Sequence, residues 1–288
     1  TLIISGGEPF LRTDLPEIIQ YAKETENIQQ VQVITNGTVI NTESLKKISK
    51  WIDGIAISFD GYNRENPTFI RNGRIFEKLI SSVNLMKSYD IKVSILPTIH
   101  SKNYNKLKEY VNLAKELQTD ISFSLLTCEP DNIAFKDYLP TNEQLKVIGE
   151  TITHLSLEND VTVQDMPIND SIDLRKSCEV GNKIISIGAD GAVYPCHMLH
   201  KKELVMGNIF TQDLDEILRG KLAEYCKNLN VNDFLACKDC KHKYLCGGGC
   251  RARSYYKYEN LESTDFYCSM TSHFFDVVTG ALEHKYLE

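Results

Sequence analysis

The sequence lacks several features that would place it in a common class of protein. No apolar run approaches the roughly 20 residues needed to span a bilayer, and no secretory leader is visible. The 32 Lys and Arg are outnumbered by 39 Asp and Glu, so the net charge is −7 and a basic nucleic-acid-binding surface is missing. The charge balance and the lack of a spanning segment therefore favour small molecules or peptides as partners over nucleic acid or membrane, whereas the missing leader says little about the compartment.

Cysteine is absent from the first 127 residues, although the 288-residue chain contains nine. Eight of the nine lie at or after Cys178. An odd total with such uneven placement is atypical of a secreted disulfide-bonded domain. The distribution indicates a reducing compartment and a metal-binding C-terminal module.

Short apolar, β-rich segments alternate with helical patterns up to residue 127. The predicted strands span residues 2–5, 31–35, 54–60, 91–99 and 121–127. Between them, apolar residues recur at the three-to-four spacing of helices. Repeated strand–helix units predict a parallel sheet, open or curled into a barrel, with ligands at the C-terminal strand ends.

The pattern changes further along the chain. Residues 128–170 are expected to form a connecting segment with one helix, and residues 171–288 a smaller module. Short strand-like pieces, the hairpin signal "ADG", and one short helix over "LDEILRGKLAEYC" precede the cysteine cluster. The first residues, "TLIISGGEPF", predict a strand that starts inside a core, so we expect a fragment whose N-terminus is missing.

Polar groups and glycines follow the first three predicted strands. In "SGGEP", Gly6 and Gly7 allow the backbone to turn sharply and approach a ligand, and Glu8 supplies a carboxylate for an ammonium group. "TNG", with Asn36, closes the second strand, and "SFDG", with Ser58, closes the third. Each segment is also compatible with an ordinary turn at the end of a strand.

The late cysteines have the spacing of a metal centre. Seventeen residues separate Cys178 from Cys196, "CKDCKHKYLCGGGC" spans Cys237 to Cys250, and seventeen more residues precede Cys268. This pattern indicates zinc or iron–sulfur clusters. Only one C-x2-C pair is present, and there are nearly enough thiolates for two four-thiolate clusters, which favours iron–sulfur. Structural zinc is the main alternative, followed by disulfides.

Taken together, these motifs resemble radical S-adenosylmethionine (SAM) enzymes with a SPASM extension that holds auxiliary iron–sulfur clusters. "SGGEP" after a strand matches the first part, and Gly191 with Cys196 supplies the G-x4-C of the second. The resemblance covers essentially the whole chain. It implies an α/β fold: a partial (βα)6 barrel lacking its first strand over 1–127, a connection over 128–170, and a Cys-rich SPASM (twitch) domain over 171–288.

The resemblance also assigns roles to individual residues. The SAM contacts would be Gly6, Gly7, Glu8, Asn36, Ser58 and Arg71, the last of which is alternatively a surface arginine. One auxiliary [4Fe–4S] cluster would be held by Cys237, Cys240, Cys246 and Cys268. The other would be held by Cys178, Cys196 and Cys250, with either Cys226 or a substrate thiolate in the fourth position. An inert buried thiol is an equal alternative for Cys226 and Cys128.

Two departures from the family pattern bear on function. No cysteine precedes Cys128, so the C-x3-C-x2-C loop that holds the SAM-cleaving cluster is absent, and the chain as given is not expected to start radical chemistry. His197 follows Cys196 directly, where anaerobic sulfatase maturases carry an aspartate as a proposed base. Histidine is able to act as a base near neutral pH.

In this family a reduced cluster splits SAM into methionine and a 5′-deoxyadenosyl radical, which abstracts a substrate hydrogen. The resemblance implies an enzyme that acts on a peptide or protein, and we expect it to form Cys thioether cross-links in a Cys-containing ribosomal precursor peptide. Its reductant would be a flavodoxin or ferredoxin. The alternatives are a sulfatase maturase, another SPASM enzyme that acts on a small molecule or one peptide side chain, and a non-catalytic zinc-binding module.

Overall fold

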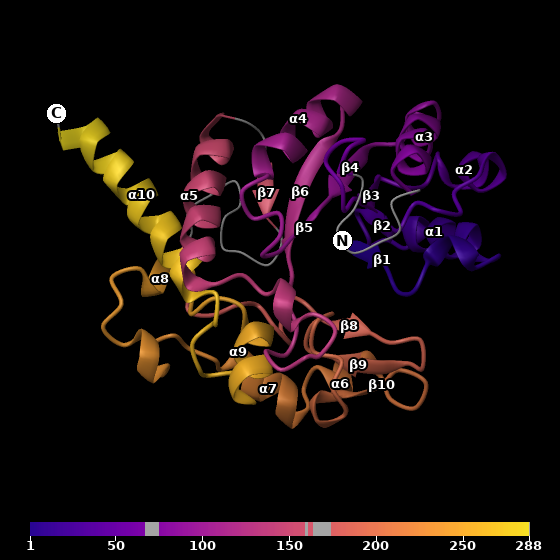
Figure 1. Ribbon diagram of the computed structural model, residues 1–288. Coiled ribbons are helices and arrows are strands. Elements are labelled where there is room, and N and C mark those ends of the chain that lie inside the picture. Colours follow the sequence, from indigo (N-terminus) through magenta and orange to yellow (C-terminus); the bar gives the residue numbers. More distant parts are fainter. Residues whose placement is uncertain (67–74, 159–160, 164–173, 288) are drawn as a thin grey trace. The chain divides into compact units, whose positions relative to one another are not determined.

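The structure is a computed structural model that describes residues 1–66, 75–158, 161–163 and 174–287 (Figure 1). The chain divides into two compact units. The first comprises Thr1–Leu126 and Thr151–Gln164, and the second comprises Thr127–Glu150 and Asp165–Glu288. Helix α5 (Asn142–Glu158) supplies residues to both units.

A parallel sheet forms the centre of the first unit. Its strands are β1 (Leu2–Ile4), β2 (Val31–Thr35), β3 (Gly54–Ser58), β4 (Val93–Leu96), β5 (Thr98–Ile99), β6 (Asp120–Leu125) and β7 (Val161–Val163). β1, β2, β3, β4 and β6 are neighbours in that order, β5 and β7 also pair with β6, and each of these pairings is parallel. The prediction of a parallel sheet built from βα units is confirmed.

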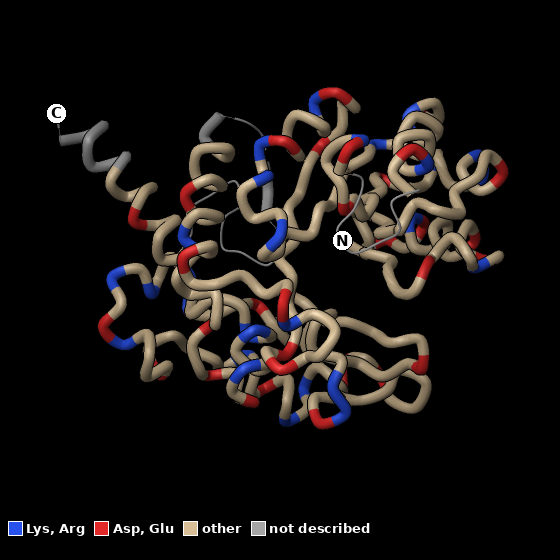
Figure 2. The backbone as a smooth tube through the Cα atoms, in the orientation of Figure 1, with Lys and Arg blue, Asp and Glu red and all other residues tan. Residues whose placement is uncertain are grey.

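Helices connect the strands of this unit. They are the 3-10 helix η1 (Pro9–Leu11) and the α-helices α1 (Leu15–Glu24), α2 (Thr42–Ile48), α3 (Ile75–Lys87) and α4 (Leu107–Leu117). In α1, buried Leu15, Ile19 and Ala22 form one apolar stripe at helical spacing. Helix α2 begins after Asn41, whose side chain accepts the Ser44 N–H at 2.9 Å. Acidic and basic residues lie close together along these helices (Figure 2).

The predicted strand over residues 91–99 is two strands, because Pro97 interrupts it. Proline has no N–H to give to a neighbouring strand, but the Pro97 carbonyl still accepts the Ser124 N–H at 2.9 Å. Ser94 pairs with Asp120 in β4, and Thr98 pairs with Ser124 in β5, so the register along β6 is unchanged. Strand β7 was not predicted from the sequence.

The second unit contains a small antiparallel sheet of β8 (Ser186–Ile187), β9 (Ala192–Tyr194) and β10 (Gly207–Asn208). Ser186 pairs with Tyr194 across a turn in which Gly191 has a φ of +78°, a backbone angle that glycine adopts without strain. The hairpin predicted from "ADG" is therefore confirmed.

The other helices of this unit are short, except the last. They are η2 (Lys136–Tyr138), η3 (Lys202–Leu204), α6 (Leu214–Ile217), α7 (Lys221–Lys227), η4 (Leu235–Cys237), α8 (Lys243–Cys246), α9 (Arg251–Tyr258) and the long α10 (Cys268–Leu287). The single helix predicted over "LDEILRGKLAEYC" is two, because the chain turns at Gly220 before α7 begins. None of the helices among the described residues is long and apolar enough to cross a membrane.

Candidate functional site

The Glu8 carboxylate joins the ends of β1 and β2. Its Oε1 accepts hydrogen bonds from the Thr35 hydroxyl at 2.6 Å and from the Phe10 N–H at 3.2 Å. Its Oε2 accepts the Asn36 N–H at 2.8 Å. A carboxylate offers roughly four acceptor positions, so Glu8 has capacity for one further donor, such as a ligand ammonium group.

The backbone before Glu8 faces open space. A Cβ atom added at Gly6 or Gly7 would have no heavy atom within 4 Å. Gly6 has a φ of +145°, which residues with a side chain rarely adopt. Both glycines are exposed, so another molecule is able to approach their peptide groups closely.

The next two strand ends contribute Asn36 and Ser58. The Asn36 side chain is held in a turn, where its Oδ1 accepts the Thr38 N–H at 2.8 Å and the Thr38 hydroxyl at 2.7 Å. Ser58 is the half-buried last residue of β3, which pairs with β2. Thus Glu8 and Asn36 are joined directly and Ser58 ends the adjacent strand, while Arg71 lies outside the described residues.

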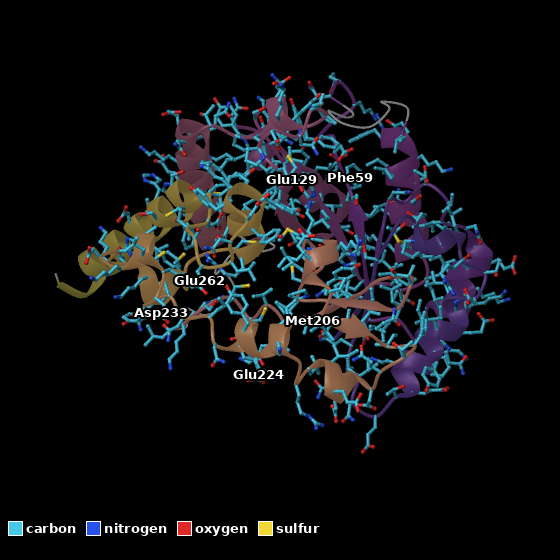
Figure 3. The ribbon with its side chains drawn as sticks, turned by 90° about the horizontal axis from the view of Figure 1, so that it is seen from below. Phe59, Glu129, Met206, Glu224, Asp233 and Glu262 are labelled. Carbon is cyan, nitrogen blue, oxygen red and sulfur yellow. The ribbon has the colours of Figure 1, made fainter. Side chains whose placement is uncertain are left out.

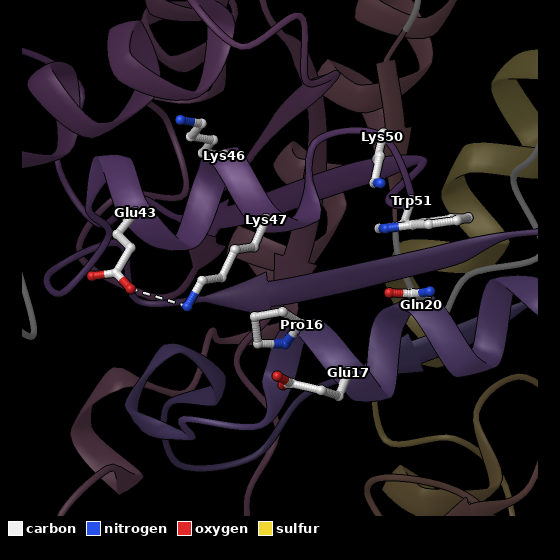
Figure 4. A pocket seen from close by; sticks show the side chains of 8 residues that line it. All are labelled: Pro16, Glu17, Gln20, Glu43, Lys46, Lys47, Lys50 and Trp51. Atoms are coloured by element: carbon white, nitrogen blue, oxygen red, sulfur yellow. Dashed lines mark hydrogen bonds and ion pairs between the residues drawn. The ribbon is translucent and has the colours of Figure 1, made fainter.

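A separate surface hollow involves the outer helices α1 and α2 (Figure 4). Glutamates of both helices line it, together with lysines of α2 and with Lys50 and Trp51 just after α2. Lys47 pairs with Glu43 at 3.0 Å. None of the site residues predicted from the sequence is in its lining. Its mixed, solvent-exposed charges indicate no specific ligand.

Four cysteines of the second unit line one cavity: Cys237, Cys240, Cys246 and Cys268. They come from η4, the segment after it, α8 and the start of α10. Burial raises the pKa of the Cys246 thiol to about 12, and it also raises the pKa values of Cys237 and Cys268. Such thiols lose their protons when positively charged metal binds.

The glycine loop beside this cavity folds in an unusual way. Gly247, Gly248 and Gly249 have φ values of +62°, +83° and +76° in succession. A Cβ at Gly249 would lie 2.6 Å from Asp265, and one at Gly248 would lie 2.7 Å from Phe234. Only glycine suits these positions, and the loop brings the Gly248 backbone into the cavity lining.

A buried ion pair supports the loop. Arg253 and Asp265 are both about 2% exposed or less, and their side chains meet at 2.7 Å. Asp265 also accepts the backbone N–H groups of Cys250 and Tyr267, each at 2.8 Å. Sequence reasoning missed this pair, because charges in "CRARS" and "STDFYC" look like ordinary surface charges.

The remaining predicted cluster ligands share one packed core of the second unit. Cys226 and Cys250 are buried in it, and Cys178 and Cys196 pack against it. Burial, with a contribution from nearby Cys178, raises the pKa of Cys226 to about 11. The core also contains a backbone donor aimed at sulfur, since the Met198 N–H lies 3.3 Å from Cys196 Sγ. Such bonds stabilise thiolates that bind iron.

The space around Cys226 is closely fitted. A Cβ at Gly181, whose φ is +65°, would lie 2.9 Å from Cys226 Sγ. The Gly181 N–H bonds to the Pro195 carbonyl at 2.9 Å, next to Cys196 in the chain. The structure thus brings the Cys226 side chain close to the backbone of the segments that carry Cys178 and Cys196.

Within the described ranges, no three His, Cys, Asp or Glu side chains converge as ligands of a single metal ion. A [4Fe–4S] cluster binds each thiolate through a different iron atom, so its four sulfur atoms stand apart around the cube. The four thiols that line the cavity are of the type that both zinc and iron–sulfur clusters bind.

His197, the predicted base, is exposed, and its Nδ1 lies 3.9 Å from Cys196 Sγ. Tyr256 lies deeper, donates its hydroxyl to the Met198 carbonyl, and has its ring 5.4 Å from Lys201 Nζ. Lys201 pairs in turn with Glu129, which Figure 3 labels. Burial, together with Glu129 and nearby thiols, raises the pKa of Tyr256 to about 12, so this phenol stays protonated near neutral pH.

Comparison with known families agrees with the two units. Residues 1–114 match the model of the radical SAM superfamily, and residues 178–241 match SPASM, an iron-sulfur cluster-binding domain. The chain carries a radical SAM domain and a SPASM domain. Radical SAM/SPASM proteins are enzymes whose cofactors are SAM and [4Fe–4S] clusters.

Two curated relatives align with 93% of this chain. The AdoMet-dependent heme synthase of Methanosarcina barkeri is 26% identical, and the alignment covers 81% of that protein. The PqqA peptide cyclase of Granulibacter bethesdensis is 25% identical, with 73% of that protein covered.

Solved structures confirm the fold. AnSMEcpe with bound AdoMet has a TM-score of 0.75 at 20% identity, over 98% of this chain and 83% of that one. Streptococcus suis SuiB bound to the precursor peptide SuiA has a TM-score of 0.69 at 17% identity, over 92% of this chain and 64% of that one. The partial radical SAM barrel with a SPASM domain is thus the architecture of this protein.

Proposed function

We propose that this radical SAM/SPASM enzyme oxidises a peptide, and that its product is a Cys thioether cross-link in a ribosomally made precursor. The observation that carries the proposal is the cavity lined by Cys237, Cys240, Cys246 and Cys268. A thiolate-lined cavity of this kind suits an iron–sulfur cluster, and hence electron transfer during an oxidation.

Different residues would bind SAM, hold the auxiliary clusters and act as a base. Gly6, Gly7 and Glu8 would bind the methionine end of SAM, through open backbone and a carboxylate already oriented by Thr35. Asn36, Ser58 and Arg71 would complete the SAM contacts, and His197 would act as a base. The cysteine-lined cavity would hold one auxiliary cluster, and Cys178, Cys196, Cys226 and Cys250 would hold the other. When bound, SAM and a reduced cluster supply a carbon radical that removes a hydrogen atom from the substrate.

A peptide substrate is favoured by two relatives. One is named PqqA peptide cyclase, and one solved neighbour, SuiB, is bound to a precursor peptide. The second candidate is a small-molecule substrate, which the similarity to the AdoMet-dependent heme synthase favours. A reducing, cytoplasmic setting and a flavodoxin or ferredoxin as reductant belong to the same proposal.

Mass measurement distinguishes these functions. Since no cysteine precedes Cys128, the assay uses a protein that also contains the C-x3-C-x2-C loop, with SAM, reductant and candidate Cys-containing precursor peptides. A thioether cross-link removes two hydrogens, so the peptide mass falls by about two daltons per link, and one free thiol is lost with it. A Cys240→Ala variant serves as the control and should leave the peptide unchanged. Unchanged peptide with the intact enzyme, alongside turnover of a porphyrin, would reject the peptide proposal.

A further inference from the structure

Arg251 is a cation buried entirely within the second unit. Its side chain is 0% exposed, and its guanidinium lies 4.5 Å from the centre of the Phe234 ring. Its hydrogen bonds go to the backbone carbonyls of Gly249 at 3.2 Å, Leu261 at 2.7 Å, Ser263 at 2.8 Å, and Gly248. These four contacts engage four of its five N–H donors, and none of the acceptors carries a full negative charge.

The neighbouring Arg253 has a different environment. It forms an ion pair with Asp265, so its charge is balanced within the protein. Arg251 has no carboxylate within ion-pair distance among the described residues. A lone charge in a core is strongly unfavourable unless an opposite charge compensates it. An anion bound nearby would therefore stabilise the buried guanidinium.

The cysteine-lined cavity is where that anion would lie. Gly248, whose carbonyl accepts from Arg251 Nη2, is part of the cavity lining. Phe234, whose ring the guanidinium faces, also accepts the Cys237 N–H through its carbonyl at 2.8 Å. An iron–sulfur cluster with four thiolate ligands is an anion, and each added electron increases its negative charge.

We propose that Arg251 is a positioning residue that raises the reduction potential of the auxiliary cluster held by Cys237, Cys240, Cys246 and Cys268. This inference rests on the cluster assignment in the proposed function. A fixed positive charge in a dry core stabilises the more negative, reduced state and is little screened by water. Electrons from substrate oxidation then enter this cluster more readily.

The test compares variants of the anaerobically reconstituted 288-residue chain by redox titration followed by electron paramagnetic resonance. The signal that Cys240→Ala abolishes identifies the cluster in question. Arg251→Gln should lower the equilibrium constant for one-electron reduction about tenfold, which is about 59 mV. Arg251→Lys keeps the charge and should stay near the wild-type potential. Lys238→Gln, an exposed charge between Cys237 and Cys240, is the matched control and should change the potential little.

The outcomes separate the inference from the proposed function. A wild-type chain that binds no iron defeats the cluster assignment itself. If the wild-type chain binds the cluster and iron-loaded Arg251→Gln has the same reduction potential as the wild type, only the role of Arg251 is rejected. If Arg251→Gln loses its iron, the Arg251→Lys variant provides the test. A cluster retained in Arg251→Lys at the wild-type potential supports the proposal. A cluster retained in Arg251→Lys at a lower potential overturns it. Loss of iron in both variants would make Arg251 purely structural and would also overturn it.

Discussion

Asp265 accepts the backbone N–H of Cys250 at 2.8 Å, which ties the end of the glycine loop to the segment that precedes Cys268. Burial alone would raise the pKa of Asp265, but the charge of Arg253 and hydrogen bonds from Arg253, Tyr267 and Cys250 outweigh it and hold the pKa below its ordinary value. One carboxylate thus connects segments that carry predicted ligands of both auxiliary clusters.

Replacing this carboxylate should destabilise the second unit. Asp265→Asn leaves Arg253 buried without its counter-charge, and breaking such a pair costs about 3–5 kcal/mol. Chemical unfolding should show this loss, together with a lower iron content. Glu262→Gln, an exposed carboxylate three residues away, is the control and should change stability by less than about 0.5 kcal/mol.

A double variant tests the explanation. Arg253→Met with Asp265→Leu removes both charges, so it should be more stable than Asp265→Leu alone. If the double variant is the less stable of the two, the buried unpaired charge is not the cause of the destabilisation.

Much of the barrel was predictable because each strand is short, apolar and followed by a turn. The predicted strand over 31–35 coincides with β2, and "SGGEP" follows β1 as expected. The break at Pro97 is also explicable from the sequence, since proline has no N–H. Domain boundaries at 127 and 170 and the individual site residues stay predictions.

The contacts that support the glycine loop and the cysteine-lined cavity were not predictable from one sequence. Arg251, Arg253 and Asp265 are separated by up to fourteen residues, and only the tertiary fold shows that they are buried. Likewise, the sequence predicted Glu8 as a carboxylate for a ligand, but not that it accepts hydrogen bonds from Thr35 and Asn36. Polar partners in separate segments carry no periodic signal, unlike the apolar faces of strands and helices.

Gly7→Ala should separate SAM binding from folding. Its new methyl group meets no protein atom within 4 Å, so stability should change by less than about 0.5 kcal/mol. The same methyl group occupies the space assigned to SAM, and affinity should fall about tenfold, or 1.4 kcal/mol, in calorimetric titration of protein that contains the C-x3-C-x2-C loop. Gly6→Ala should instead lower stability, by about 1–3 kcal/mol, because of its φ of +145°.

Gly280→Ala is the matched control for this series. A methyl group there also meets no atom within 4 Å, and SAM affinity should not change. Equal SAM affinity of the Gly7→Ala variant and the wild-type protein would remove the "SGGEP" segment from the proposed site.

Cys226→Ser should reduce the iron content by one cluster. Cys226 lies in the core with Cys250, and Cys178 contributes to its raised pKa. Cys128→Ser is the matched control, because Cys128 is also a buried thiol whose pKa burial raises, with Glu129 as the second cause. Iron analysis and resonance spectra should show a loss only for Cys226→Ser. If that variant keeps both clusters, Cys226 is not a ligand. The fourth iron of the cluster held by Cys178, Cys196 and Cys250 would then be open to a substrate thiolate.

His100 should make the stability of the first unit depend on pH. It follows β5, is 1% exposed, and its Nδ1 accepts the Lys102 N–H at 3.1 Å. Burial, assisted by the charge of Lys102, lowers the pKa of His100 from 6.5 to about 4. The unfolded chain therefore binds a proton between pH 6.5 and 4 that the folded chain does not bind, and stability falls as the pH falls through that range.

The size of the effect follows from the width of that range. From pH 7 to pH 5 the His100 contribution should fall by about 2 kcal/mol, since each pKa unit corresponds to about 1.4 kcal/mol. His100→Gln should remove this part of the pH dependence in urea unfolding, whatever its stability at pH 7. His154→Gln, which alters an exposed histidine of α5, is the control and should keep the wild-type dependence. If His100→Gln and the wild-type chain lose equal stability between the two pH values, His100 is protonated in the folded protein and its burial does not exclude the charge.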